Sequence, residues 1–551
     1  MAWSTKKVSE IVDDAVAHKL SVPEFQREFV WDNGKVRDLI DSLFRDYPVG
    51  QFLVWKPPKP FGYSRTHDEK HEPLWIIDGQ QRATAFCLIL GKKPGWWTEQ
   101  ECGPWERRKQ DCDVLVKVVP PSKDNVEFSL PSAVRRQDPC WVSVREIIEA
   151  NEKGELVKFS WRIVERLKES GQTVEEDALI GLLLKVAEIR SRPIVIVEID
   201  HEVEDVAEIF ARLNQAGVRV KEADTVFALA AVKNPGWARD KYRKFRGDLD
   251  DAGWDLPPAV IIRTIAAIGA GRARFKEVKS DFWERDSFTN AWEKTKMAIS
   301  KVVKQLESRG IVNVALLPTK NVLIPVFVFE ALFDDGGYNF NHVFHWLLLA
   351  TKAGVYTGAA ITTLNQDVKA LHESPSWQDA IEKLRSRLET EHEMRPEDFM
   401  VRFDRATSRF HQLIIYLLLQ KTCARDWIEK VKIGYDKDEI TRLVGFTPNW
   451  HHIFPKALLR GRFSDEKIQA IANLTIVTSE TNCKKLKDKV PSYYIPEYNI
   501  GTGLLKEHLI PEPFASNPML MVMDNYENFL NKRAELLAQK ANEFFASLLD
   551  N

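Results

Sequence analysis

The chain has 551 residues, of which 44% are hydrophobic and 29% are charged. This composition excludes global disorder, and the length predicts roughly two to four domains rather than a single core. The formal net charge of −2 excludes a surface coated with positive charge, although a few local Lys and Arg side chains suffice to bind a nucleic-acid backbone.

The six cysteines are scattered along the chain without a CxxC pair, which argues against a disulfide framework or a zinc ribbon. Residues 1–20 lack the apolar run of a signal peptide, and the longest apolar stretches, such as 413–419, are too short to span a bilayer. We therefore expect a soluble, cytoplasmic protein with no membrane partner.

The N-terminal region alternates short helical and extended patterns. Residues 8–20 are predicted to form an amphipathic helix, and Pro23 interrupts the extended segment that follows it. Residues 49–55 are strand-like. Asp32 is a predicted N-cap, because apolar residues recur behind it at helical spacing: Val36, Leu39, Ile40, Leu43 and Phe44.

Further strands are predicted at 74–77, 113–119 and 193–199, and a helix is predicted at 203–213. A mixture of short strands and helices of this kind is typical of an α/β unit. Residues 1–220 are therefore predicted to form one mixed α/β domain.

Beyond residue 220 the pattern is mostly helical, which predicts a helical linker domain over 221–400. A long helix or helix pair is predicted over 403–430, and one long helix over 519–549. The intervening region 446–500 combines His, Pro, Asn and Lys with a strand-like run, and we assign 401–551 to a third domain. The predicted fold class is thus α+β and multidomain.

The sequence Asp-Gly-Gln-Gln-Arg lies between a predicted strand and a predicted helix, where free backbone N–H groups attract anions. Gly79 permits close approach of the backbone to a ligand, Arg82 is suited to bind phosphate through two hydrogen bonds, and Asp78 to hold a metal or a ribose. Gln-Arg pairs also cap helices and bridge strands without binding anything. The predicted nucleotide-binding residues are Gln26, Arg27, Asp78, Gly79, Gln80, Gln81 and Arg82.

The strongest chemical signal is the sequence His-His-Ile-Phe-Pro, which begins at His451. Two adjacent histidines point in different directions, so that one can bind a metal while the other accepts a proton. Asn473 and Asn482 follow downstream, and Lys484 and Lys485 come directly after them as candidate contacts to the DNA backbone. A histidine pair alone is more often structural, but this conjunction is specific.

The four residues together resemble the pattern of HNH (ββα-metal, His-Me finger) nucleases. The resemblance implies that His451 and Asn482 bind a divalent cation, that His452 is the general base and that Asn473 orients the loop that carries it. Phosphodiester hydrolysis needs an activated water and a cation beside the developing charge. Many related sequences carry an acidic residue at the first position and His at the last, which leaves the choice between Mg²⁺ and Mn²⁺ open.

Three N-terminal segments, Val-Pro-Glu-Phe-Gln-Arg at 22–27, Tyr-Pro-Val-Gly at 47–50 and Ile-Asp-Gly-Gln-Gln-Arg at 77–82, resemble the N-terminal domain of GmrSD-type (type IV) restriction enzymes. Residues 209–217 also match that pattern. The family is similar to the ParB nucleotide-binding fold. The resemblance implies nucleoside triphosphate binding and hydrolysis coupled to cleavage of modified DNA, such as glucosylated hydroxymethylcytosine or phosphorothioate DNA. The chain has no Walker A sequence, so hydrolysis would not be of the P-loop kind.

We interpret the chain as an anti-phage restriction endonuclease that acts on modified phage DNA under nucleotide control, with homo-oligomers as a possible assembly. One alternative is a nucleotide-triggered, non-specific nuclease toxin. The other is a nucleotide-dependent DNA-binding clamp with an inactive HNH domain, which the presence of all four HNH residues argues against.

Overall fold

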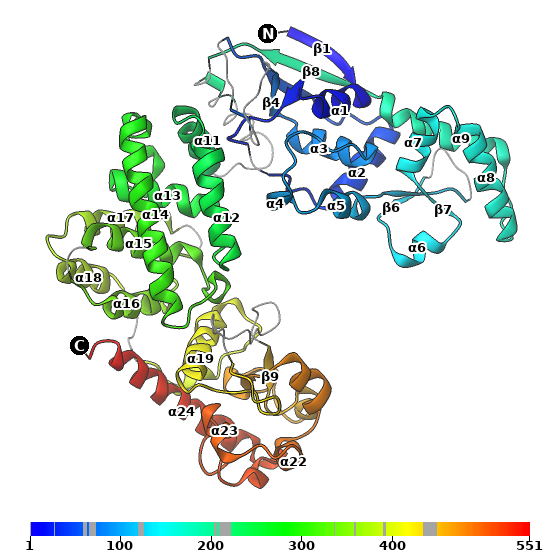
Figure 1. Ribbon diagram of the computed structural model, residues 1–551. Helices are drawn as coiled ribbons and strands as arrows, with labels where there is room; N and C mark the ends of the chain where they lie inside the picture. The colour runs from blue at the N-terminus through cyan, green and yellow to red at the C-terminus, as the bar shows by residue number, and fades with distance from the viewer. Residues whose placement is uncertain are drawn as a thin grey trace. The chain divides into compact units, whose positions relative to one another are not determined.

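The computed structural model describes residues 2–550 apart from 27, 59–62, 65–72, 120–125, 203–204, 207–208, 210–221, 335–336, 358–359, 389–392 and 434–448. The chain forms two compact units, Met1–Gly247 and Asp248–Asn551, and both helices and strands contribute to the fold (Figure 1). The mixed α+β class is therefore as predicted, whereas the finer division into three domains at residues 220 and 400 stays a prediction.

The first unit is built on a five-stranded mixed sheet. Strand β8 is antiparallel to β1 and parallel to β3, while β4 is antiparallel to β3 and parallel to β2. The strand at 193–199 is confirmed over its whole predicted length. The order across the sheet is β1 (Ala2–Lys7), β8 (Pro193–Ile199), β3 (Phe52–Trp55), β4 (Leu74–Asp78) and β2 (Leu20–Ser21).

Strand β1 was not predicted, because its sequence is polar and its side chains are mostly exposed at the edge of the sheet. The N-cap at Asp32 is confirmed, since its carboxylate accepts a hydrogen bond of 2.9 Å from the Lys35 N–H. Helix α2 (Asn33–Phe44) begins directly after it and buries the predicted apolar face.

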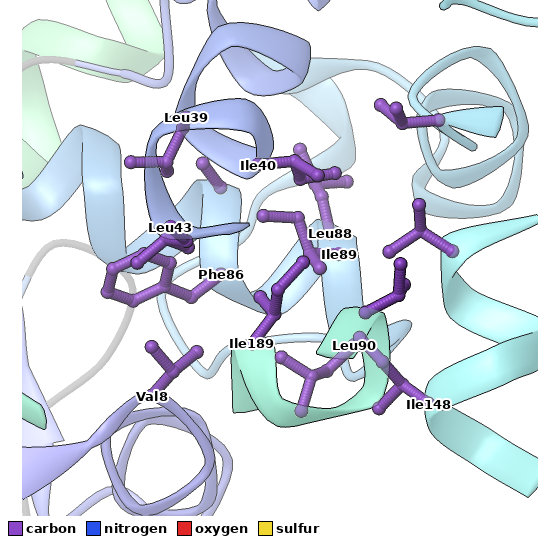
Figure 2. Close-up of a cluster of buried hydrophobic side chains, with 14 of the residues drawn as sticks. Val8, Leu39, Ile40, Leu43, Phe86, Leu88, Ile89, Leu90, Ile148 and Ile189 are labelled. Atoms are coloured by element: carbon purple, nitrogen blue, oxygen red, sulfur yellow. The ribbon is translucent and has the colours of Figure 1, made fainter. Parts of the chain in front are cut away.

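The core of this unit joins α2 to helices α1 (Val8–Val16), α3 (Gln80–Leu90) and α7 (Val144–Glu152). Figure 2 shows side chains from these helices and from Ile189 meeting in one apolar cluster. A small sheet in the order β6 (Phe128–Ser129), β5 (Leu115–Lys117) and β7 (Trp141–Ser143) is also present. The other helices are α4 (Glu99–Cys102), α5 (Trp105–Asp111), α6 (Ala133–Gln137), α8 (Leu156–Glu169), α9 (Glu176–Ala187), α11 (Glu222–Lys233), the π-helix η2 (Trp237–Tyr242) and α12 (Arg243–Asp251).

The second unit is mainly helical. Helices α13 (Pro258–Ala270), α14 (Arg285–Glu307) and α15 (Leu323–Phe333) pack against one another. The helix predicted over 403–430 is shorter, because α19 (Arg409–Lys421) ends before Cys423, whose φ of 52° is left-handed. The other helices are α16 (Phe340–Lys352), α17 (Ile361–His372), α18 (Trp377–Ser386), α20 (Lys456–Leu459), α21 (Asp465–Ile468), α22 (Pro491–Glu497), α23 (Thr502–Glu507) and α24 (Tyr526–Ser547).

Helix α24 supplies most of the predicted C-terminal helix and packs against α19 and the short turn η10 (Ile471–Asn473). No helix in the described part of the chain has both the length and the apolar character needed to cross a membrane.

Candidate functional site

The C-terminal candidate residues lie on a small antiparallel sheet and the π-helix that follows it. Strand β9 (Trp450–His452) pairs with β10 (Leu474–Ile476), so that His452 faces Leu474 across the ladder. The π-helix η11 (Thr481–Leu486) comes soon after β10 and carries Asn482. This arrangement brings His451, His452, Asn473 and Asn482 close together.

His451 and Asn482 are in direct contact. The His451 Nδ1 atom lies 2.8 Å from the Asn482 Oδ1 atom, and the Asn482 amide donates to Asn449 Oδ1 at 2.6 Å. His451 is only 2% exposed, and its Nε2 atom is buried without a hydrogen-bond partner in the described part of the chain. The contact therefore leaves one ring nitrogen of His451 unsatisfied.

The spacing of these two side chains fits a divalent cation. Neighbouring ligands around Mg²⁺, at bond lengths of about 2.1 Å, lie about 3.0 Å apart, close to the 2.8 Å between His451 Nδ1 and Asn482 Oδ1. In the structure the contact is a hydrogen bond to an amide oxygen, so Nδ1 carries a proton that a cation would have to displace. Within the described residues, no three His, Cys, Asp or Glu side chains gather in a way that could hold a metal ion. A cation held by His451 and Asn482 would therefore keep its other positions for water and phosphate.

His452 lies beside this pair and contacts a different partner. Its Nε2 atom is 3.0 Å from Gln469 Oε1. Burial lowers the pKa of both His451 and His452 to about 4, against the opposing effects of their amide partners. Both imidazoles are therefore neutral at pH 7, the form that can bind a metal or accept a proton.

Asn473 holds the loop after β9 in place through side-chain hydrogen bonds to its backbone. Its side-chain oxygen accepts a hydrogen bond from the Phe454 N–H at 3.0 Å, and its amide group donates to the Phe454 carbonyl at 3.0 Å and to the Ile468 carbonyl at 3.3 Å. Asn473 is fully buried. These bonds fix the backbone directly after His452, and the orienting role predicted for Asn473 is consistent with this geometry.

Arg533 supports Asn473 from the C-terminal helix α24. Its guanidinium donates to the carbonyls of Ala472 and Leu474, each at 2.7 Å, and to those of His508 and Leu509. The side chain is fully buried, and burial lowers its pKa to about 9, so it remains a cation at neutral pH. Sequence analysis missed Arg533, because a single Arg in an amphipathic helix has no local signature.

Asp426 supports the other end of the site. Its buried carboxylate accepts hydrogen bonds from the Thr478 N–H and the Thr481 hydroxyl, each at 2.7 Å, and from the backbone N–H groups of Ile428 and Glu429. Thr481 begins the π-helix that carries Asn482. Asp426 therefore fixes the start of that helix, and it was also missed.

The two candidate DNA-backbone lysines are on the surface of the same π-helix. Lys484 is 72% exposed and forms an ion pair with Glu480 at 2.6 Å. Lys485 is exposed. Exposed ion pairs of this kind are weak, so a phosphate could replace Glu480 at little cost.

The N-terminal candidate turn has the predicted strand-turn-helix form. Gly79 follows β4 and precedes α3 with a φ of 106°, and a Cβ atom there would meet the Phe52 ring at 2.7 Å. The close approach that glycine permits in this structure is to Phe52. A role for Gly79 in binding a ligand remains a prediction.

Arg82 and Gln81 are engaged within the protein. Arg82 donates to the Val49 carbonyl at 2.8 Å and to the Asp78 carboxylate at 2.9 Å. Gln81 donates to the Glu28 carbonyl at 2.9 Å. The structure thus joins the motif at 77–82 to that at 47–50. The guanidinium also leaves no room for a side chain at Gly50, because a Cβ atom there would lie 2.5 Å from Arg82 Nη1.

Of the remaining candidate nucleotide-binding residues, the structure describes Gln26 and Gln80. Gln26 is buried and donates to the Ile77 carbonyl at 2.9 Å, next to Asp78. Gln80 is also buried. Arg27 and most of the segment at 209–217 lie outside the described residues.

Glu24, in the first motif, was not predicted as a functional residue. It is fully buried, and its carboxylate accepts hydrogen bonds from the N–H groups of Gly236 at 2.7 Å and Arg239 at 3.0 Å. Arg243 donates to its backbone carbonyl at 2.8 Å. Burial raises the pKa of the Glu24 carboxyl to about 7, against the opposing effects of these N–H groups and of the two arginines. Glu24 therefore ties the first motif to η2.

This pKa predicts a pH-dependent stability. Between pH 4.5 and about 7, folded Glu24 holds a proton that the unfolded chain releases, so the free energy of unfolding falls as the pH rises. We expect the Glu24→Gln variant to lose this pH dependence, which amounts to about 3 kcal/mol in the free energy of unfolding. Urea unfolding at several pH values measures it, with the exposed Glu155→Gln as control. Parallel profiles for the wild type and Glu24→Gln would show that Glu24 does not titrate in this range.

Comparison with known proteins adds two findings. A protein of Methanocaldococcus jannaschii, described as uncharacterized, is 21% identical over 604 residues, which cover 99% of this chain and 100% of the relative. Residues 8–231 match the family model of the GmrSD restriction endonuclease N-terminal domain. This match includes all of the N-terminal motifs, so the chain is similar to that domain over residues 8–231.

Proposed function

We propose that the chain is an anti-phage restriction endonuclease that cleaves modified DNA through a one-metal HNH site at His451, His452, Asn473 and Asn482. The observation that carries this proposal is the 2.8 Å contact between His451 Nδ1 and Asn482 Oδ1, directly beside a neutral imidazole at His452. The family match supplies independent support for DNA as the substrate.

The chemistry follows from the positions of these side chains. His452 accepts a proton from water as the water oxygen attacks phosphorus and one P–O ester bond breaks. The negative charge of the phosphate raises the pKa of a neighbouring imidazole and thereby strengthens the base. Asn473 keeps the backbone after His452 in place. A divalent cation held by His451 and Asn482 supplies positive charge beside the phosphate and the leaving oxygen.

We further propose that residues 1–220 form a ParB-like domain that binds and hydrolyses a nucleoside triphosphate and controls cleavage. The strand-turn-helix geometry at Asp78–Arg82 supports this role, since the first turn of α3 provides backbone N–H groups to an anion. Hydrogen bonds from Gln26 and Gln81 connect that turn to the first motif and to Glu28, which follows it. Nucleotide binding at the turn would therefore alter the contacts of these residues.

The proposal is tested by cleavage of matched plain and glucosyl-hydroxymethylated phage DNA with Mg²⁺ or Mn²⁺, with and without each nucleoside triphosphate. Cleavage of modified DNA alone supports the restriction enzyme. Metal-dependent cleavage of both DNAs favours the alternative of a nucleotide-triggered toxin. DNA binding without cleavage on these substrates and on phosphorothioate DNA favours the inactive clamp.

Nucleotide control predicts a specific effect of Arg82→Ala. We expect nucleoside triphosphate hydrolysis to fall by about 10-fold or more, since a bidentate phosphate contact is worth roughly 1.5–3 kcal/mol. Hydrolysis rates and the nucleotide dependence of cleavage measure the effect, together with Tm, because Arg82 also holds the Val49 carbonyl. The control is Arg37→Ala, which removes a half-buried arginine paired with Asp38. An unchanged nucleotide dependence in Arg82→Ala would remove Arg82 from the nucleotide site.

A further inference from the structure

Gln469 is the partner of the candidate general base. It follows α21 as the C-cap residue, and its side-chain oxygen lies 3.0 Å from His452 Nε2. The residue is only 9% exposed. Its side chain therefore meets the imidazole in a region largely closed to solvent.

The backbone holds Gln469 firmly in this position. Its N–H donates to the Asp465 carbonyl at 3.0 Å, and its carbonyl accepts a hydrogen bond of 2.8 Å from the Phe403 N–H. The following residue, Ala470, is fully buried and forms a β-bridge with Arg402. A side chain anchored on both sides in this way is suited to fix the orientation of its partner.

The contact also selects a tautomer of His452. An amide oxygen only accepts hydrogen bonds, so the imidazole Nε2 must carry the proton and Nδ1 must carry the lone pair. His452 is half-buried, and in the described part of the chain its Nδ1 atom has no hydrogen-bond partner. The lone pair therefore remains free to accept a proton.

We propose that Gln469 is a positioning residue that holds His452 with Nε2 protonated and Nδ1 open to the attacking water. This inference rests on the proposed nuclease function. The water proton moves to Nδ1 as the oxygen bonds to phosphorus and one P–O ester bond breaks. The Nε2–H donates to Gln469 Oε1 before and after that transfer, so the ring does not need to turn.

Kinetics of Gln469 variants test the role with the full chain and the DNA duplex that the wild type cleaves fastest. We expect Gln469→Leu to lower kcat by about 100-fold, as loss of orientation does, with KM for DNA unchanged within about 3-fold. Gln469→Glu keeps an acceptor and should recover kcat to within about 10-fold of the wild type. Gln366→Leu, which removes an exposed glutamine on α17 that accepts a hydrogen bond from Arg387, should leave both constants unchanged. An unchanged kcat in Gln469→Leu, or no recovery in Gln469→Glu, would overturn the proposal.

A spectroscopic measurement tests the same contact without cleavage. Imidazole ¹⁵N spectra of the histidine-labelled full chain distinguish the two tautomers, and the signals missing from His452→Ala identify His452. We expect the Nε2–H form in the wild type and a mixture in Gln469→Leu. The Nδ1–H form in the wild type would contradict the proposal. If the Nε2–H form is present but His452→Ala still cleaves DNA, the nuclease assignment fails while the positioning contact stands.

Discussion

His452→Ala should lower kcat for metal-dependent DNA cleavage by about 10²–10⁴-fold, the usual contribution of a general base. The variant removes the imidazole that we propose accepts the water proton, but it keeps the contact between His451 and Asn482 and the hydrogen bonds of Asn473 to Phe454. Folding should be preserved, because His452 contributes one side-chain hydrogen bond, to Gln469. Single-turnover cleavage assays at saturating Mn²⁺ measure the loss.

The control for this variant is His201→Ala, which removes an exposed histidine and should retain wild-type cleavage. Circular dichroism and Tm should match the wild type in both proteins. Cleavage at the wild-type rate in His452→Ala would show that another group accepts the proton and that the His-His pair does not form a nuclease site.

Arg533→Met should produce the largest loss of stability. The substitution leaves four buried carbonyls without their donor, those of Ala472, Leu474, His508 and Leu509. An unsatisfied buried acceptor costs about 1–3 kcal/mol, and with partial relaxation we expect a total of about 3–5 kcal/mol. Tm should fall by about 6–12 °C, and cleavage should decrease because the turn that carries Asn473 loosens.

Lys532→Met is the matched control, since it replaces an exposed cation on the neighbouring position of α24 and should shift Tm by about 1 °C or less. Differential scanning fluorimetry compares the two variants. A Tm for Arg533→Met within the error of Lys532→Met would mean that water or backbone movement replaces the guanidinium contacts.

The proximity of the four C-terminal candidate residues could be predicted from the sequence, because they lie within 451–482 and are joined by one short pair of strands. Their roles in cleavage stay a prediction. The residues that support this site could not be predicted from the sequence. Asp426 and Arg533 reach the site through contacts across 52 and 61 positions, from Asp426 to Thr478 and from Arg533 to Ala472. Neither helical periodicity nor a turn signal distinguishes a buried polar residue of this kind from an exposed one.

The N-terminal unit shows the same limit. Asp32, β4 and β8 could be predicted from capping chemistry and apolar runs. The edge strand β1 could not, because it contributes few buried side chains. The burial and the hydrogen bonds of Glu24 could not be predicted from the motif that contains it, because its partner Gly236 is 212 positions away. Its burial arises from tertiary structure alone.

The contacts between Arg533 and the backbone around Asn473 can form only late in synthesis. A ribosome that has completed β9, β10 and η11 has yet to translate α24. Until that helix emerges, the carbonyls on either side of Asn473 lack the guanidinium that they bind in the finished chain. A nascent or prematurely terminated chain therefore contains every proposed nuclease residue without the guanidinium that binds the backbone around Asn473.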